Sequence, residues 1–203
     1  EHNLQSLRVV DALEERFPDF DGLDLAFETR EGILKHGSRR HALRPEGRGP
    51  GGDWRPVLDG PQASLEAQLC NLADEVAYNA HDIDDGVRSG LLTLEQLGEV
   101  ELFDACRREA LAAFPQLEGR RLLFEIIRRM VSRQVGDLIT TTRAALDAAA
   151  PASVDAVRAA ARPLVQFGAP MRALGAQSKR FLHANLYRHP QVVETTDRAR
   201  RVI

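Results

Sequence analysis

Residues 64–92, SLEAQLCNLADEVAYNAHDIDDGVRSGLL, form the stretch that decides the fold. With a rotation of about 100° per residue, this stretch predicts one long amphipathic helix. The predicted apolar face carries Leu69, Leu72, Val76, Ala80, Ile83 and Val87. The opposite face carries Asp74, Tyr78, His81, Asp82 and Asp85. These five polar residues therefore form a single stripe along the helix.

The polar stripe is either a solvated surface or one wall of a ligand site. An arbitrary polar helix face is more often a solvated surface. Two features favour a site here. No Lys or Arg stands between Arg55 and Arg88, although seven acidic residues do, whereas a solvated acidic face usually has basic residues interleaved at four-residue spacing. Tyr78 also lies one turn from Asp74 and from Asp82, which suits a concave site where a ring packs on a ligand and a carboxylate holds a metal or a hydroxyl.

The stripe also resembles the last metal-ligand helix of the dGTPase-like deoxynucleotide triphosphohydrolases of the HD superfamily. The matching segments are residues 73–78 (ADEVAY) and 81–86 (HDIDDG). Two further blocks, 1–8 (EHNLQSLR) and 28–36 (ETREGILKH), resemble other parts of that family in the same order, and 181–189 (FLHANLYRH) adds weaker support. The resemblance covers most of the chain as far as residue 92.

The resemblance implies roles for four residues. The family holds a divalent metal, Mg²⁺ or Mn²⁺, through an early His, an adjacent His-Asp pair and a distant Asp, and the distant Asp matches Asp74. Tyr78 would close off the 2′ side of the deoxyribose, and Asp82 would accept a hydrogen bond from the 3′-hydroxyl. His2 would lie near the substrate phosphates as a catalytic residue, although a lone His at a helix start is otherwise more often a cap or a surface residue.

The other metal ligands are expected before residue 1. The only His-Asp pair in the sequence, His81-Asp82, lies inside the helix that already carries Asp74. His81, Asp84 and Asp85 match the family's run, and we give them no role beyond helix surface and support. Because one ligand of four is present, we expect this 203-residue chain alone to be inactive.

The implied fold is all-α, with residues 1–92 forming the C-terminal part of an HD phosphohydrolase core and 93–203 a helical region packed on it. The implied activity is hydrolysis of a dNTP, dGTP among the candidates, to a deoxynucleoside and triphosphate, by a homo-oligomer. Two alternatives remain open. One is a non-catalytic regulatory or nucleic-acid-binding protein, and the other is a different HD phosphohydrolase, a phosphodiesterase or a 5′-nucleotidase.

The composition sets broad limits. A chain of 203 residues with 43% hydrophobic content can bury one sizeable core or two small ones, and one helical domain is the simpler choice. A net charge of -3 argues against a dedicated nucleic-acid binder. Cys70 and Cys106 stand among apolar helical neighbours, which predicts buried thiols in a cytoplasmic protein. No apolar run approaches the ~20 residues of a membrane span. The sequence lacks an initiator Met, so we expect a piece of a longer protein.

Around the central helix, the pattern predicts further helices. Residues 3–16 read as a short amphipathic helix, Gly22 marks a turn, and Thr29 is expected to cap a helix through His36. Residues 37–61 are rich in Gly, Pro and Arg. We interpret them as a mobile basic surface loop, and the alternative is a flap that contacts phosphate. The arginines of this segment are the only direct support for the nucleic-acid-binding alternative.

The second half of the chain also reads as helical throughout. Thr93 and Gln96 fit a capping box that opens a stretch to about Phe114. Residues 119–149 give the longest pattern, with arginines on a face interpreted as solvated. Its apolar side is Leu122, Leu123, Ile126, Ile127, Met130, Val131, Val135, Leu138 and Ile139. Ser153 is expected to cap a helix to about Phe167, and two last helices are expected after Pro170 and Pro190.

Overall fold

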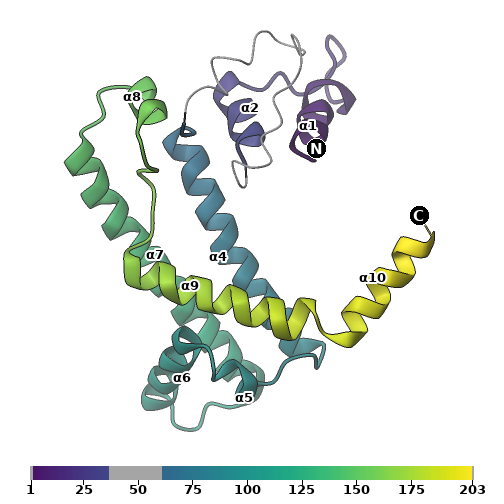
Figure 1. Cartoon of the computed structure of the whole chain (residues 1–203), viewed down its shortest axis with the longest axis vertical. Helices are drawn as coiled ribbons and strands as arrows, with labels where there is room; N and C mark the ends of the chain where they lie inside the picture. The colour runs from purple at the N-terminus through teal and green to yellow at the C-terminus, as the bar shows by residue number, and fades with distance from the viewer. Residues whose placement is uncertain (1, 37–60, 203) are drawn as a thin grey trace. The chain divides into compact units, whose positions relative to one another are not determined.

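The computed structural model describes residues 2–36 and 61–202. It is 73% helical, and no strand occurs in the described residues, which confirms the all-α prediction. The chain divides into two compact units (Figure 1). Unit 1 is Glu1–Ala73 with Thr142–Gln166, and unit 2 is Asp74–Thr141 with Phe167–Ile203. The predicted boundary at residue 92, between the HD core and the C-terminal helical region, stays a prediction, because units defined by contacts do not test it.

Unit 1 contains α1 (His2–Arg8), the π-helical turn η1 (Val9–Leu13), α2 (Phe27–Leu34), α8 (Val154–Ala159) and the beginning of α4 (Leu65–Arg88). A small core joins α1 to α2 through Leu7 and Leu34, with Leu4, Val10 and Ile33 packed against it. The first helical segment ends at Leu13 rather than at Arg16. The reason is that Glu14 adopts an extended backbone and its N–H donates back to Val9 O at 3.0 Å, which closes the π-helical turn.

Gly22 follows a bend over residues 18–21 and forms an isolated bridge with Glu15, and the structure shows why glycine is required there. Gly22 has φ +74°, and a Cβ there would lie 2.4 Å from the backbone carbonyl of Asp11. The capping role predicted for Thr29 is wrong. Helix α2 begins earlier, at Phe27, with Ala26 as a cap that makes no side-chain hydrogen bond, and it ends at Leu34 before His36.

The cap of α8 is confirmed, but its predicted length is not. Ser153 Oγ accepts a hydrogen bond from the backbone N–H of Ala156 at 3.2 Å. The helix then ends at Ala159, far short of Phe167. The chain beyond is held as irregular structure because the N–H groups of Leu164 and Val165 donate to Gln68 Oε1 at 2.9 and 3.1 Å.

Unit 2 contains the remainder of α4, α5 (Leu94–Leu97), α6 (Glu101–Ala113), most of α7 (Gly119–Ala149), α9 (Ala169–Leu182), η3 (His183–Tyr187) and α10 (Pro190–Val202). Figure 1 shows α5 and α6 folded against α7. Fifteen buried residues form the core, including Leu97, Phe103 and Ile126, which have no exposed surface. Burying each such side chain contributes about 1.5–3 kcal/mol, so this cluster dominates the stability of unit 2.

The central helix forms as predicted, over slightly narrower bounds. Ser64 Oγ accepts a hydrogen bond from the N–H of Ala67 at 3.3 Å at its start, and Gly90 with φ +75° turns the chain after its end. Val76 and Ile83 are buried on its apolar face. The prediction is wrong at Leu69, whose side chain is 49% exposed.

The predicted capping box at Thr93 is confirmed, because both of its hydrogen bonds are present. Thr93 Oγ1 accepts from Gln96 N, and Gln96 Oε1 accepts from Thr93 N. The helical stretch does not run unbroken to Phe114, however, because residues 98–100 separate α5 from α6. The bounds of α7 match the prediction, except that Val135 and Ile139 on its expected apolar side are exposed.

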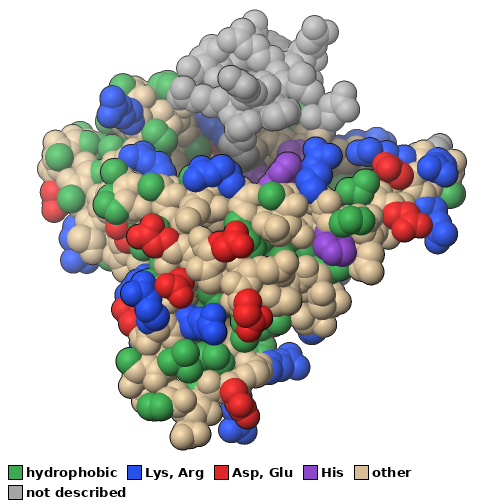
Figure 2. All heavy atoms as spheres, turned by 60° about the horizontal axis from the view of Figure 1, so that its bottom comes forward, with side chains coloured by type: hydrophobic (Ala, Val, Ile, Leu, Met, Phe, Trp, Pro, Cys, Tyr) green, Lys and Arg blue, Asp and Glu red, His purple; other side chains and the backbone are tan. Residues whose placement is uncertain are grey.

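The surface of the described residues carries charges of both signs. Figure 2 shows acidic and basic side chains interspersed on one face. On α7, Arg128 and Arg129 pair with Glu125 at 2.7 Å, as expected for a solvated face. Among the thiols, Cys106 is buried as predicted, whereas Cys70 is exposed, because its helical position does not face a core. No helix in the described part of the chain is long and apolar enough to cross a membrane.

Candidate functional site

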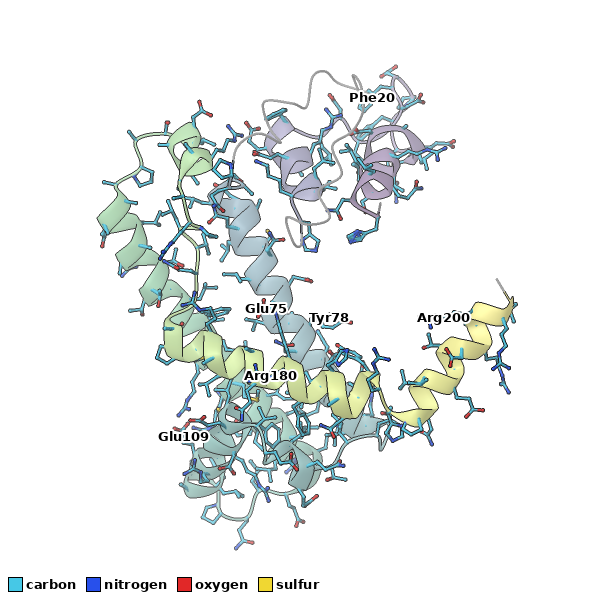
Figure 3. All side chains as sticks on the ribbon, in the orientation of Figure 1. Phe20, Glu75, Tyr78, Glu109, Arg180 and Arg200 are labelled. Carbon is cyan, nitrogen blue, oxygen red and sulfur yellow. The ribbon has the colours of Figure 1, made fainter. Side chains whose placement is uncertain are left out.

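The predicted site residues Asp74, Tyr78 and Asp82 lie one turn apart along α4, in unit 2. Asp74 is exposed, Tyr78 is 57% exposed, and Asp82 is half-buried. Figure 3 shows Tyr78 and Glu75 on the part of α4 that α9 crosses. The helix therefore presents two carboxylates and a ring on one accessible face, as the sequence predicts.

Asp82 has a partner from a distant part of the chain. The hydroxyl of Tyr187, on η3, donates a hydrogen bond to Asp82 Oδ2 across a separation of 105 residues. Burial raises the pKa of Asp82 above its ordinary value, and Asp85 adds to the rise, although the hydrogen bond from Tyr187 opposes it. Burial also raises the pKa of Tyr187, with further contributions from Asp82 and Tyr78, so its phenol keeps its proton and acts as a donor.

A second contact from the same region neutralises part of the acidic charge of α4. Lys179, on α9, pairs with Glu75 at 2.8 Å. At the end of α4, Arg88 pairs with Asp85 at 2.5 Å. Within the described residues no side chain pairs with Asp74. The site thus has one carboxylate held by a phenol and another that is open to solvent.

The described residues do not form a complete metal site. They contain no cluster of three or more His, Cys, Asp and Glu side chains that could hold a metal ion. Asp74 fits the part of a single ligand, because it is an exposed carboxylate with no protein partner among these residues. His2 is the first residue of α1, exposed and in unit 1, and its place in the site stays a prediction.

The sequence analysis assigns no site role to Tyr187 or Lys179. The structure brings both onto α4. The sequence feature that could have identified Tyr187 is the segment 181–189, which contains it and carries the weaker part of the family resemblance. His183 lies one turn before Tyr187, and its ring meets the Tyr187 ring edge-on at 6.4 Å between centroids. This segment is therefore part of the candidate site.

Comparison with known proteins shows which proteins the chain is similar to. No family model matches the chain. It is 60% identical over all of its 203 residues to a deoxyguanosinetriphosphate triphosphohydrolase-like protein of Ralstonia nicotianae. Proteins of the same name from Bordetella pertussis and Nitrosomonas europaea are 54% and 48% identical, again over the whole chain. Over its whole length the chain is therefore homologous to proteins named dGTPase-like.

This chain spans about half the length of the dGTPase-like relatives, 51% in the Ralstonia protein and 53% in the Nitrosomonas protein. The relationship confirms the resemblance seen in the sequence. The assignment of its helices to an HD domain follows from that relationship rather than from the helices themselves.

Proposed function

We propose that this chain supplies one wall of the nucleotide site of a metal-dependent deoxynucleoside triphosphate triphosphohydrolase. In this proposal Asp74 is a metal ligand, Tyr78 and Asp82 hold the deoxyribose, and His2 lies near the phosphates. The observation that carries it is the hydrogen bond between Tyr187 and Asp82 on the accessible face that also presents Tyr78. The names of the relatives support the substrate class.

The sugar pocket has a clear physical basis. Tyr187 occupies Oδ2 of Asp82, so Oδ1 is left to accept a hydrogen bond from the 3′-hydroxyl of a sugar. The ring of Tyr78, packed against C2′, would leave no room for a second hydroxyl. A ribonucleotide would then have to displace the ring or bury an unpaired donor, and either outcome lowers its affinity.

The metal would be shared with ligands outside the described residues. A bound Mg²⁺ or Mn²⁺ polarises phosphoryl oxygen and lowers the pKa of a coordinated water. Asp74 alone holds such an ion weakly, because Mg²⁺ gives up its waters reluctantly and needs several ligands in fixed geometry. We therefore expect no dNTP hydrolysis by the isolated 203-residue chain.

The proposal is tested in a chimera, because the chain alone is expected to be inactive. This chain replaces the 203 matching residues of the Ralstonia nicotianae relative, with which it is 60% identical. Triphosphate release from dGTP is measured with Mg²⁺ and with Mn²⁺. The variants are Asp74→Ala, Tyr78→Ala and Asp82→Ala, with Glu118→Gln as the control, since Glu118 is an exposed carboxylate that does not belong to α4.

We expect Asp74→Ala to abolish turnover, Asp82→Ala to raise KM, and Tyr78→Ala to narrow the preference for dGTP over GTP. Tyr187→Phe keeps the ring but removes the donor to Asp82, so it should raise KM with a smaller effect on kcat. Unchanged turnover in Asp74→Ala at normal metal affinity would remove Asp74 from the site. Absence of dNTP hydrolysis in both the chimera and the parent relative would overturn the proposed activity.

The same assay separates the alternatives. Release of a phosphate product other than triphosphate favours a different HD phosphohydrolase. The alternative of a nucleic-acid-binding protein rests on the arginine-rich segment 37–61, nearly all of which lies outside the described residues. Tight, steeply salt-dependent binding of single-stranded DNA without dNTP turnover would favour that alternative.

A further inference from the structure

Unit 1 contains an open pocket of about 560 Å³ that none of the predicted site residues lines. Its walls come from α2, the first two turns of α4 and the start of α8. A volume of this size is within the usual range for small-molecule sites, about 300–1,000 Å³. The pocket lies wholly within residues of one unit, so its shape does not depend on how the two units are placed.

The floor of the pocket is mostly apolar. Ile33 of α2, Ala67 of α4 and Val154 of α8 line it, and the Val154 side chain is 48% exposed. Gly32 lets α2 approach α4 closely, since a Cβ there would lie 3.3 Å from the Cβ of Ala67. The apolar surface at Val154 is therefore open rather than covered by the described chain.

The charged groups of the pocket have one sign. Two exposed carboxylates, Glu28 and Glu66, line it, and no Lys or Arg does so among the described residues. Two of the neutral polar groups have partners within the protein. Ser64 Oγ accepts from Ala67 N, and His36 Nδ1 lies 2.5 Å from Asn71 Oδ1, which can only accept, so His36 is the donor. The two carboxylates make no ion pair with the described residues and can interact with a ligand.

We propose that this pocket binds a small organic cation, a primary amine carried on an apolar aromatic or aliphatic body. The apolar walls hold the body, and the carboxylates of Glu28 and Glu66 attract the ammonium group. The same charges disfavour a nucleotide, because among the described residues a triphosphate would meet two carboxylates and no Lys or Arg. The site is therefore distinct from the proposed dNTP site, and either proposal can fail without the other.

The exposed Cys70 gives a direct readout, because it lines the pocket while Cys106 is fully buried. The 203-residue chain is treated with iodoacetamide, and alkylation of each cysteine is followed by mass spectrometry. The probes are phenethylamine and its anionic counterpart of similar size, phenylpropionate, with benzyl alcohol as the neutral analogue and dGTP as the nucleotide. Cys106 serves as the internal reference for intact folding.

We expect phenethylamine at about ten times its Kd to slow alkylation of Cys70 about tenfold, with no protection by phenylpropionate or dGTP. Glu28→Gln and Glu66→Gln should each weaken protection by the amine about two- to fivefold, as for an exposed ion pair, and leave binding of benzyl alcohol unchanged. Glu118→Gln, an exposed change in the other unit, should have no effect.

Three outcomes would overturn the proposal. The first is equal protection by phenethylamine and phenylpropionate, which would mean that charge does not select the ligand. The second is protection by the amine that survives in the Glu28→Gln, Glu66→Gln double variant. The third is no protection by any amine while helicity, measured by circular dichroism, and the slow reaction of Cys106 both show a folded chain.

Discussion

Glu31 provides the sharpest test of how unit 1 is held together. Its side chain, on α2, has no exposed surface. Its carboxylate accepts hydrogen bonds from Lys35 Nζ at 2.8 Å and from Arg158 Nη2 at 2.7 Å. Arg158 belongs to α8, 127 residues further along the chain. Glu31→Gln keeps the shape of the side chain and removes the charge that both cations need.

The expected loss of stability follows from the burial of the pair. Removing one partner of a buried ion pair costs about 3–5 kcal/mol, because a charge is left uncompensated. The lower end applies here, since Arg158 and Lys35 keep 18% and 11% of their side-chain surface and have second partners, Asp155 and the carbonyl of Gln62. We therefore expect a loss of about 3 kcal/mol, or roughly a hundredfold in the opening equilibrium of unit 1.

The pH dependence has a definite sign. Burial alone would raise the pKa of Glu31, but the hydrogen bonds from Arg158 and Lys35 outweigh it and hold the pKa below its ordinary value of 4.5. A lowered folded-state pKa means that the contribution is complete above pH 4.5 and is lost as the pH falls through the folded-state value. Glu31→Gln lacks this titrating carboxylate, so the free energy of unfolding of unit 1 should fall less steeply below pH 4.5 in the variant than in the parent.

Hydrogen exchange followed by mass spectrometry is the suitable assay, because it reports on peptides of α2 and α8 separately from unit 2. Glu28→Gln, an exposed change on the same helix, is the matched control and should stay within about 0.5 kcal/mol of the parent. If Glu31→Gln and Glu28→Gln exchange at the same rate in α2 and α8, the buried ion cluster does not hold unit 1 together.

Two further predictions concern the backbone. Gly22→Ala should destabilise unit 1 by at least about 2 kcal/mol, because it adds positive-φ strain and a clash with the backbone of Asp11. Gly90 has φ +75° and open space around it, so Gly90→Ala should cost only the strain, about 1 kcal/mol. Equal denaturation midpoints for the two variants would refute the role of the close approach. Thr93→Ala should destabilise the start of α5 by about 1 kcal/mol, and Thr93→Ser should keep the stability of the parent, as measured by amide exchange at Gln96. An unchanged exchange rate in Thr93→Ala would show that the capping box is not stabilising.

Local chemistry explains which parts of the fold were predictable from sequence. Helix α7 begins at Gly119 and ends at Ala149, as its periodicity and flanking residues indicate, and the caps at Thr93 and Ser153 are confirmed because a cap involves residues only three positions apart. The end of η1 and the exposure of Cys70 were not predictable in this way. Periodicity identifies an apolar helix face, but whether another element covers that face is decided by tertiary packing.

The same distinction applies to the candidate site. The spacing of Asp74, Tyr78 and Asp82 on one helix face could be read from the sequence, because it is fixed by 3.6 residues per turn. The contact between Asp82 and Tyr187 could not, because it joins residues 105 positions apart. No local pattern specifies such a pair, and the sequence analysis did not predict it.

The charge of the α4 stripe separates its carboxylates by role. The sequence offers one cation near them, Arg88, three residues after Asp85, so any partner for Asp74 or Asp82 had to come from elsewhere. The structure supplies Arg88 to Asp85 and a phenol donor to Asp82, and it leaves Asp74 as the carboxylate of the stripe without a partner in the residues it describes. A carboxylate that makes no ion pair with the described residues has none to break when it coordinates a cation, whereas Asp82 already accepts a hydrogen bond that orients it. Asp74 is thus suited to a metal and Asp82 to a sugar hydroxyl, which is the division of roles that the proposed function requires.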